Sequence, residues 1–144
     1  MTMVDVRLER EFGVSPEKLF RFVSGAKELM QWFGPEGVSV PDNDLDFSRE
    51  GPWFAVMSNA DGPFAKVSGH VTHVDPPRSV GFTWAWHDED DQRGDETHVT
   101  FTVEATAKGA RLIVDHREFA TEDAAAAHNR GWESSLNCIA AVIA

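Results

Sequence analysis

The longest periodic pattern in the chain runs from Thr121 to Ala144, and its period is that of an α-helix. Apolar and aromatic residues recur there at every third or fourth position, which places them on one helix face: Ala125, His128, Trp132, Leu136, Ile139 and Ile143. Thr121 is a favourable N-cap, and Glu122 and Asp123 put negative charge in the first turn. The pattern predicts a helix of about six turns whose apolar face packs against a sheet.

Most of the chain before this helix alternates between apolar and polar residues, which is the period of a half-buried strand. The alternation predicts strands over residues 4–12, 38–47 (with a polar step at 41–44), 53–57, 64–74, 80–86, 99–103 and 112–116. Asp61-Gly62 and Lys108-Gly109 are turn signals between neighbouring strands. Links this short predict an antiparallel sheet.

Two short helices are expected between the first and second strands. Ser15 is an N-cap followed by Pro16 at the first helical position, and a second short helix is expected over 26–31. Trp32-Phe33-Gly34-Pro35 ends this helical region. The fold class is therefore α+β: about seven antiparallel strands around a long C-terminal helix, in one domain spanning residues 1–144.

Composition and charge limit the classes of function that this chain can have. Ten Phe and five Trp with no Tyr are rings without a hydroxyl group, which suit a core or the lining of an apolar cavity. The net charge of −11 argues against nucleic-acid binding and anionic membranes. Cys138 is the single cysteine, and neither a signal peptide nor a membrane-length apolar run is evident. We expect a cytoplasmic protein without membrane insertion.

Candidate site residues come from the inward faces of the predicted strands and the last helix. Phe82, Trp84, Trp86 and Phe101 face inward if the alternation holds, either as core or as the wall of a pocket. Trp32 would lie at the mouth of that pocket, as a ligand contact or as a hydrophobic plug.

Two histidines share these inward surfaces. His116 lies on the inner face of the last strand, and His128 lies on the helix face of Trp132. They could orient a ligand or act as acid and base, or they could be core histidines. A glycine within a helix is unfavourable, so Gly131 predicts the close approach of a strand or ring. No His, Cys and carboxylate cluster has the spacing of metal ligands, and no cofactor is expected.

A set of short motifs, in this order, carries a family resemblance. The motifs are Ser15-Pro16-Glu17, Gln31-Trp32-Phe33-Gly34-Pro35, Asp61-Gly62, Pro76-Pro77-Arg78, Phe82-Thr83-Trp84, Arg111-Leu112, His116, His128 and Gly131-Trp132. Together they resemble the family named for the activator of the Hsp90 ATPase, within the Bet v 1/START-like superfamily. The resemblance implies a helix-grip fold that encloses a cavity for an apolar small molecule.

Three functions follow as hypotheses. The first is binding of an apolar or amphipathic small molecule in a cavity lined by Trp32, Phe82, Trp84, Trp86, Phe101, His116, His128 and Trp132. The second is a chaperone-associated interaction module, which the family name implies. The third is an enzyme of the polyketide cyclase or hydrolase kind, with His116 or His128 as the acid or base. A homodimer is also plausible.

Overall fold

The structure is a computed structural model that describes residues 3–144, and it contains seven strands and three helices. In chain order they are β1 (Val4–Phe12), α1 (Pro16–Ser24), α2 (Ala26–Trp32), β2 (Ser39–Asn43), β3 (Gly51–Asn59), β4 (Gly62–Asp75), β5 (Ser79–Trp86), β6 (Thr97–Ala105), β7 (Ala110–Phe119) and α3 (Glu122–Ile143).

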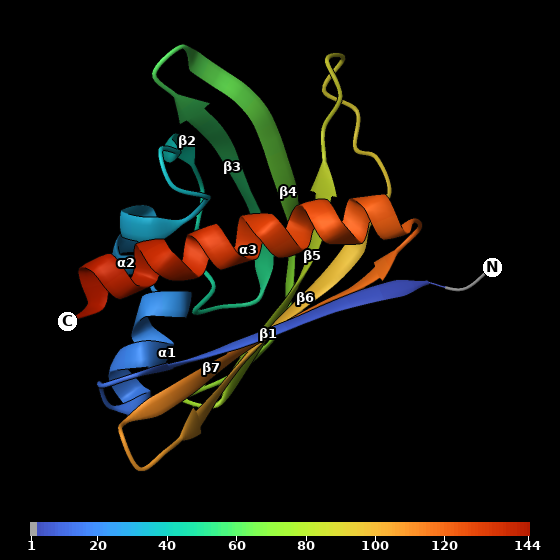
Figure 1. Cartoon of the computed structure of the whole chain (residues 1–144). Helices are drawn as coiled ribbons and strands as arrows, with labels where there is room; N and C mark the ends of the chain where they lie inside the picture. The colour runs from blue at the N-terminus through green and yellow to red at the C-terminus, as the bar shows by residue number, and fades with distance from the viewer. Residues whose placement is uncertain (1–2) are drawn as a thin grey trace.

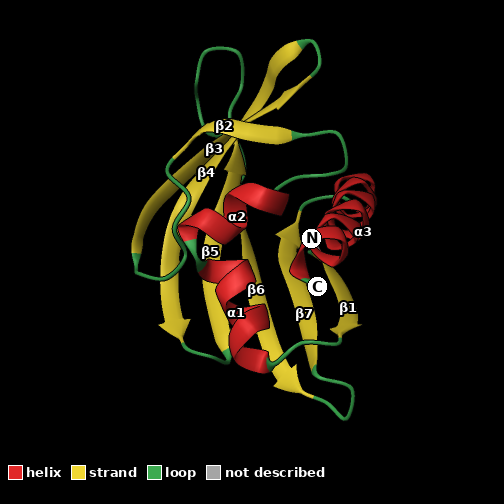
Figure 2. Ribbon diagram, turned by 90° about the vertical axis from the view of Figure 1, so that its left-hand side faces the viewer, coloured by secondary structure: helices red, strands yellow, loops and turns green. Residues whose placement is uncertain are grey.

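The strands form one antiparallel sheet in the order β1-β7-β6-β5-β4-β3-β2. The sheet is strongly curved, and α3 crosses its concave side (Figure 1). Figure 2 shows α1 and α2 on the same side of the sheet as α3, next to β5 and β6. This is the helix-grip arrangement predicted from the sequence, with the two short helices after the first strand.

The predicted N-caps of two helices are confirmed. The Ser15 hydroxyl accepts a hydrogen bond from the backbone N–H of Lys18 at 3.2 Å, at the start of α1. The Thr121 hydroxyl accepts one from the backbone N–H of Ala124 at 3.1 Å, at the start of α3. Each cap satisfies a donor that the first helical turn leaves without a partner, and this fixes where the helix begins.

The predicted strand over 38–47 is wrong in its second half. β2 ends at Asn43, whose side chain accepts a hydrogen bond from the N–H of Leu45 at 3.0 Å and donates one to the carbonyl of Val40 at 2.6 Å. Such side-chain bonds to nearby backbone compete with sheet pairing. Phe47 then donates its N–H to the carbonyl of Ser24 at 2.8 Å, so it packs inward from a loop.

A cluster of buried aromatic rings fills the core next to the two short helices. The Phe47 and Phe82 rings stack with 4.2 Å between centroids, and Phe82 meets Phe101 edge-on at 5.2 Å. Trp32 reaches this cluster from α2, 6.3 Å from Phe101, and its indole N–H donates to the carbonyl of Phe22 at 2.6 Å. Rings packed in these geometries hold α1 and α2 against the sheet.

Candidate functional site

A cavity of about 300 Å³ lies between α3 and the sheet. It is lined by Phe33, Gly34 and Pro35 after α2, Met57 of β3, Phe64 of β4, Trp84 and Trp86 of β5, and Ala127, His128, Gly131, Trp132 and Ser135 of α3. Nearly all of these side chains are apolar. The Ser135 hydroxyl donates to the carbonyl of Gly131 at 2.9 Å within the helix, so its hydrogen is already used. The cavity therefore suits an apolar guest.

Gly131 opens the cavity on the helix side. A Cβ atom built at this position would meet no atom within 4 Å. The prediction that a strand or ring packs closely against Gly131 is therefore wrong. The helix carries a residue that costs about 1 kcal/mol relative to alanine, and the missing side chain leaves free space in the cavity wall.

The segment after α2 forms a second wall through its backbone. Gly34 has φ of +104°, a conformation that side chains with a Cβ rarely adopt. A Cβ there would also lie 2.9 Å from Cγ1 of Val38. Glycine therefore lets the chain turn tightly between Phe33 and Pro35, so that both residues face the cavity.

His128 and Trp86 join α3 to β5 at the cavity wall. The Trp86 indole N–H donates to Nε2 of His128 at 2.9 Å, and Nδ1 of His128 lies 2.7 Å from the carbonyl oxygen of Ala124. An indole N–H can only donate, so Nε2 is the acceptor and Nδ1 carries the proton. Both ring nitrogens of a neutral imidazole are thereby occupied.

His116 also accepts a hydrogen bond from a tryptophan, and it is more deeply buried than His128. The Trp132 indole N–H donates to Nδ1 of His116 at 3.0 Å, and Nε2 of His116 lies 2.6 Å from the hydroxyl oxygen of Thr97. That hydroxyl in turn donates to the carbonyl of Trp84 at 3.2 Å. His116 is 0% exposed, so the ring is a buried link between β6, β7 and α3.

Burial keeps both imidazoles neutral. It lowers the pKa of His116 from 6.5 to about 2, and the nearby His128 adds to this effect. Burial also lowers the pKa of His128, while the hydrogen bond to the Ala124 carbonyl opposes that shift. Removing an imidazolium from water is costly when no carboxylate compensates for it. Neither histidine has a free ring nitrogen for proton transfer to a ligand.

A second cavity of about 240 Å³ adjoins the first beneath the start of α3. Three residues, Trp84, Trp86 and His128, line both cavities. The hydrogen bond between Trp86 and His128 therefore lies in the partition between them. The second cavity has more polar surroundings, since Asp95 and Thr97 contribute to its wall.

The structure divides the eight predicted site residues into two groups. Trp84, Trp86, His128 and Trp132 line the first cavity. Four others line neither cavity and lie in the core: Trp32, Phe82, Phe101 and His116. The inward direction of Phe82 and Phe101 is as expected, but the aromatic cluster around Phe47 fills the space in front of them.

Several lining residues were not among the predicted ones. On α3 the additions are Ala127, Gly131 and Ser135, small residues four positions apart. That spacing marks one helix face that lacks bulk, and it could have been found from the sequence. Met57 and Phe64 flank the hairpin between β3 and β4, and their alternation does not distinguish them from core residues.

One buried donor beside the cavity has no partner. The indole N–H of Trp84 has no hydrogen-bond acceptor among residues 3–144. Trp84 lines both cavities and is 5% exposed. A buried donor without an acceptor is unfavourable, so an acceptor atom supplied here would be stabilising.

The chain matches a known protein family over most of its length. The model of the family described as "Activator of Hsp90 ATPase homolog 1-like protein" (AHSA1) matches residues 13–144. The chain belongs to this family. The AHSA1 match includes every residue of the cavity wall. No curated protein matches the chain in sequence.

One solved structure agrees with the AHSA1 assignment, and two others share the fold. The chain is 58% identical to the AHSA1 protein of Silicibacter pomeroyi, with a TM-score of 0.93 and 96% of each chain covered. A protein from Chromobacterium violaceum shares 21% identity at a TM-score of 0.84, also with 96% of each chain covered. Protein Ms6760 from Mycobacterium smegmatis shares 20% identity at a TM-score of 0.80, over 97% of this chain and 90% of that one. The last two show the fold alone.

The described residues were also compared with the requirements of metal sites and of membrane-spanning helices. Within residues 3–144 no group of three His, Cys, Asp or Glu side chains is placed to bind a metal ion. None of the described helices is both long enough and apolar enough to cross a membrane.

Proposed function

We propose that this AHSA1-family protein binds an apolar or amphipathic small molecule in the cavity between α3 and β5. The observation that carries the proposal is the cavity itself, at about 300 Å³ and with an almost wholly apolar wall. Burying apolar surface there contributes about 25 cal/mol per Å². A guest of small-molecule size would therefore gain affinity mainly from burial.

The polar end of the guest is expected to lie beside Trp84. The Trp84 indole N–H lacks an acceptor among the described residues, and a carbonyl, hydroxyl or ether oxygen would supply one. His128 is a weaker candidate because Trp86 already donates to its Nε2. The preferred ligand is therefore an apolar body that carries one acceptor oxygen.

Acid–base catalysis by the cavity histidines finds little support in this geometry. Both ring nitrogens of His116 and of His128 are hydrogen-bonded within the protein. A general base needs a free lone pair near the operating pH. Binding without turnover is the better-supported role for these two residues.

The family description also suggests a chaperone-associated role, and this stays an alternative. The large apolar side chains exposed among residues 3–144 are Met3, Met30, Phe64 and Val142. Phe64 belongs to the cavity wall. Met3 precedes β1, Met30 lies on α2 and Val142 lies on α3, and they give no specific support for a docking surface.

Tryptophan fluorescence offers a direct binding test. Trp84, Trp86 and Trp132 line the cavity, three of the five tryptophans in the chain. Titration with 1-naphthol and with decanol should shift or quench the emission in a saturable way. Gly131→Leu fills the open space in the wall and should abolish saturation. Ala126→Leu places the same side chain on an exposed part of α3 outside the cavity wall, and it should bind as the wild type does. Equal binding by all three proteins would exclude this cavity.

A further inference from the structure

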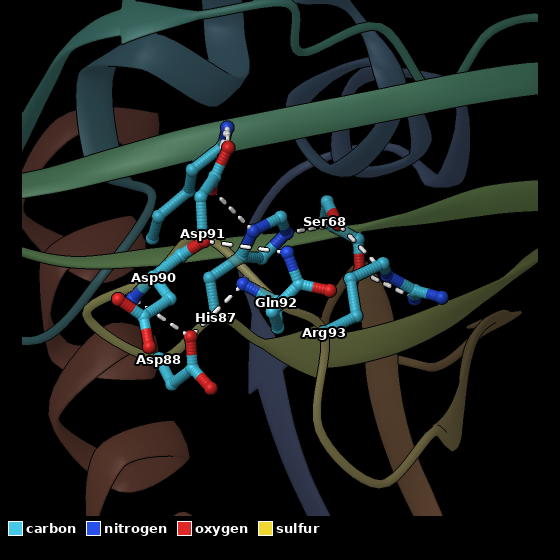
Figure 3. Close-up of polar contacts among 8 residues, drawn as sticks. Ser68, His87, Asp88, Asp90, Asp91, Gln92 and Arg93 are labelled. Atoms are coloured by element: carbon cyan, nitrogen blue, oxygen red, sulfur yellow. Dashed lines mark hydrogen bonds and ion pairs between the residues drawn. The ribbon is translucent and has the colours of Figure 1, made fainter.

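A serine, a histidine and an aspartate are linked by hydrogen bonds on the face of the sheet opposite α3 (Figure 3). Ser68 Oγ lies 2.6 Å from Nε2 of His87, and Nδ1 of His87 lies 2.7 Å from Oδ1 of Asp91. The Trp86 side chain reaches α3, so the side chain of the next residue, His87, points to the other face. The three residues lie outside both cavities.

The Asp91 carboxylate fixes the proton on one ring nitrogen of His87. A carboxylate only accepts hydrogen bonds, so Nδ1 of His87 donates to Asp91. In the neutral ring, Nε2 of His87 is then the acceptor for the hydroxyl hydrogen of Ser68. The hydrogen bond from His87 and the ammonium group of Lys66 hold the pKa of Asp91 below its usual value, which keeps the carboxylate charged. A histidine held in this tautomer can remove the proton of a serine.

Arg93 completes the surroundings of the serine oxygen. Its Nε donates to Oγ of Ser68 at 3.0 Å, and its Nη2 donates to the carbonyl oxygen of Ser68 at 3.1 Å. A hydroxyl group has one hydrogen and two lone pairs. His87 takes the hydrogen and Arg93 takes one lone pair, which leaves one lone pair for attack. Arg93 is itself held by Glu96, whose Oε2 accepts from Nη1 at 3.1 Å.

The loop that carries this constellation is tied to the sheet. The N–H of His87 donates to the carbonyl of Lys66 at 2.9 Å, and the N–H of Gly94 donates to the carbonyl of Trp86 at 2.8 Å. Oδ1 of Asp88 accepts from two backbone N–H groups inside the loop, at 2.9 and 3.0 Å. The His87 side chain is only 10% exposed. These contacts fix the loop and the His87 side chain against the sheet.

We propose that Ser68 is the nucleophile of a second site, which hydrolyses small acyl esters. Oγ of Ser68 bonds to the ester carbonyl carbon while its proton moves to Nε2 of His87. The bond from that carbon to the alcohol oxygen then breaks, and the departing alcohol takes the proton from His87. Water attacks the acyl-serine with His87 again accepting a proton, and the serine oxygen leaves and recovers that proton. One ester and one water give one acid and one alcohol.

The position of the site limits its substrates. It lies on an outer sheet face and not in either cavity, so little apolar surface is available to bind a long acyl chain. Short esters with good leaving groups are the expected class. The site is independent of the proposed ligand cavity, and a result on one does not decide the other.

Covalent labelling tests the proposal directly. The full chain is incubated with a fluorophosphonate probe or with p-nitrophenyl acetate, and the modified peptide is identified by mass spectrometry. We expect one adduct, on Ser68. Ser68→Ala should lose it, and His87→Gln, which keeps a polar side chain but no base, should lose it as well. Thermal unfolding of each variant verifies that it is folded.

A second serine–histidine pair serves as the matched control. Ser79 Oγ lies 3.2 Å from Nε2 of His73, and none of the described side chains places a carboxylate in hydrogen-bonding contact with that histidine. Ser79→Ala should label at Ser68 at the wild-type rate. An unlabelled wild-type protein would overturn the proposal. Labelling of His87→Gln at the wild-type rate, or an adduct distributed equally over Ser68 and Ser79, would do the same.

Discussion

The Trp86 indole donates its hydrogen to Nε2 of His128, with 2.9 Å between the two nitrogen atoms, in the partition between two cavities. This bond occupies Nε2 of His128 as an acceptor, and it acts together with the burial that lowers the pKa of that ring. Trp86→Phe removes the donor and keeps a smaller aromatic ring. Because Nε2 is then free to bind a proton, the pKa of His128 should rise.

The pKa of His128 can be followed by NMR titration of its ring protons. Trp132→Phe is the control, since Trp132 donates to His116 and not to His128. An unchanged pKa of His128 in Trp86→Phe would show that the hydrogen bond does not hold the imidazole neutral. Each tryptophan variant should also lose at least about 1 kcal/mol of stability, because it loses a hydrogen bond and leaves free space where the indole packed.

The free energy of unfolding should decrease as the pH is lowered, because of His116. Its pKa is about 2 in the folded protein, against 6.5 for an ordinary histidine. Between these values the unfolded chain binds a proton that the folded state does not, so acid favours unfolding. This effect alone should lower the free energy of unfolding by about 2 kcal/mol from pH 7 to pH 5, and it is absent above about pH 7.

Urea denaturation at both pH values measures this contribution. His116→Gln keeps a hydrogen-bonding side chain but cannot gain a proton in this range. The decrease from pH 7 to pH 5 should therefore be smaller in the variant by about 2 kcal/mol. An equal decrease in the two proteins would show that His116 titrates normally in the folded state.

Substitution of Gly131 should change stability and ligand affinity differently. Gly131→Ala adds a methyl group into open space and removes an unfavourable helical glycine. The free energy of unfolding, measured with urea, should rise by about 1 kcal/mol. The affinity for 1-naphthol should not rise with it, because the added methyl group reduces the free space. A destabilised Gly131→Ala variant would mean that the position is packed.

Alanine substitutions of two phenylalanines should distinguish a residue of the cavity wall from a residue of the core. Phe64 is 54% exposed and lines the cavity, whereas Phe82 is 0% exposed and does not. Phe64→Ala should change the free energy of unfolding by less than about 1 kcal/mol. It should nevertheless weaken ligand binding about fivefold, which corresponds to about 1 kcal/mol.

Phe82→Ala should show the opposite balance, with a loss of about 3–5 kcal/mol in stability. Urea denaturation and fluorescence titration of both variants make the comparison. Equal losses of stability in the two variants would place Phe64 in the core.

The sequence predicted the fold through local signals that the structure retains. Ser15 and Thr121 cap their helices because a hydroxyl group in that position satisfies a free backbone N–H, a relation that depends on neighbours in sequence alone. Strand alternation likewise placed Trp84 and Trp86 on the inner face. Leu45 and Phe47 were misplaced because a side-chain turn at Asn43 competes with the strand.

The site could be predicted only in part, for a physical reason. Alternation shows which way a side chain points, but not whether space remains in front of it. Phe82 and Trp86 share a strand face, yet Phe47 fills the space at Phe82 while the cavity remains at Trp86. Gly131 borders that cavity because it has no side chain; the spacing of Ala127, Gly131 and Ser135 shows a helix face of small residues, but not that space remains beside it.

Native mass spectrometry of the gently purified protein tests ligand binding most directly. Wild type, Gly131→Leu and Ala126→Leu are compared after incubation with decanol and 1-naphthol, and each species is then denatured to identify what it releases. We predict one bound molecule on the wild type and on Ala126→Leu, and the bare chain mass for Gly131→Leu. A wild-type protein of bare chain mass, or equal retention by Gly131→Leu, would contradict a ligand site between α3 and β5.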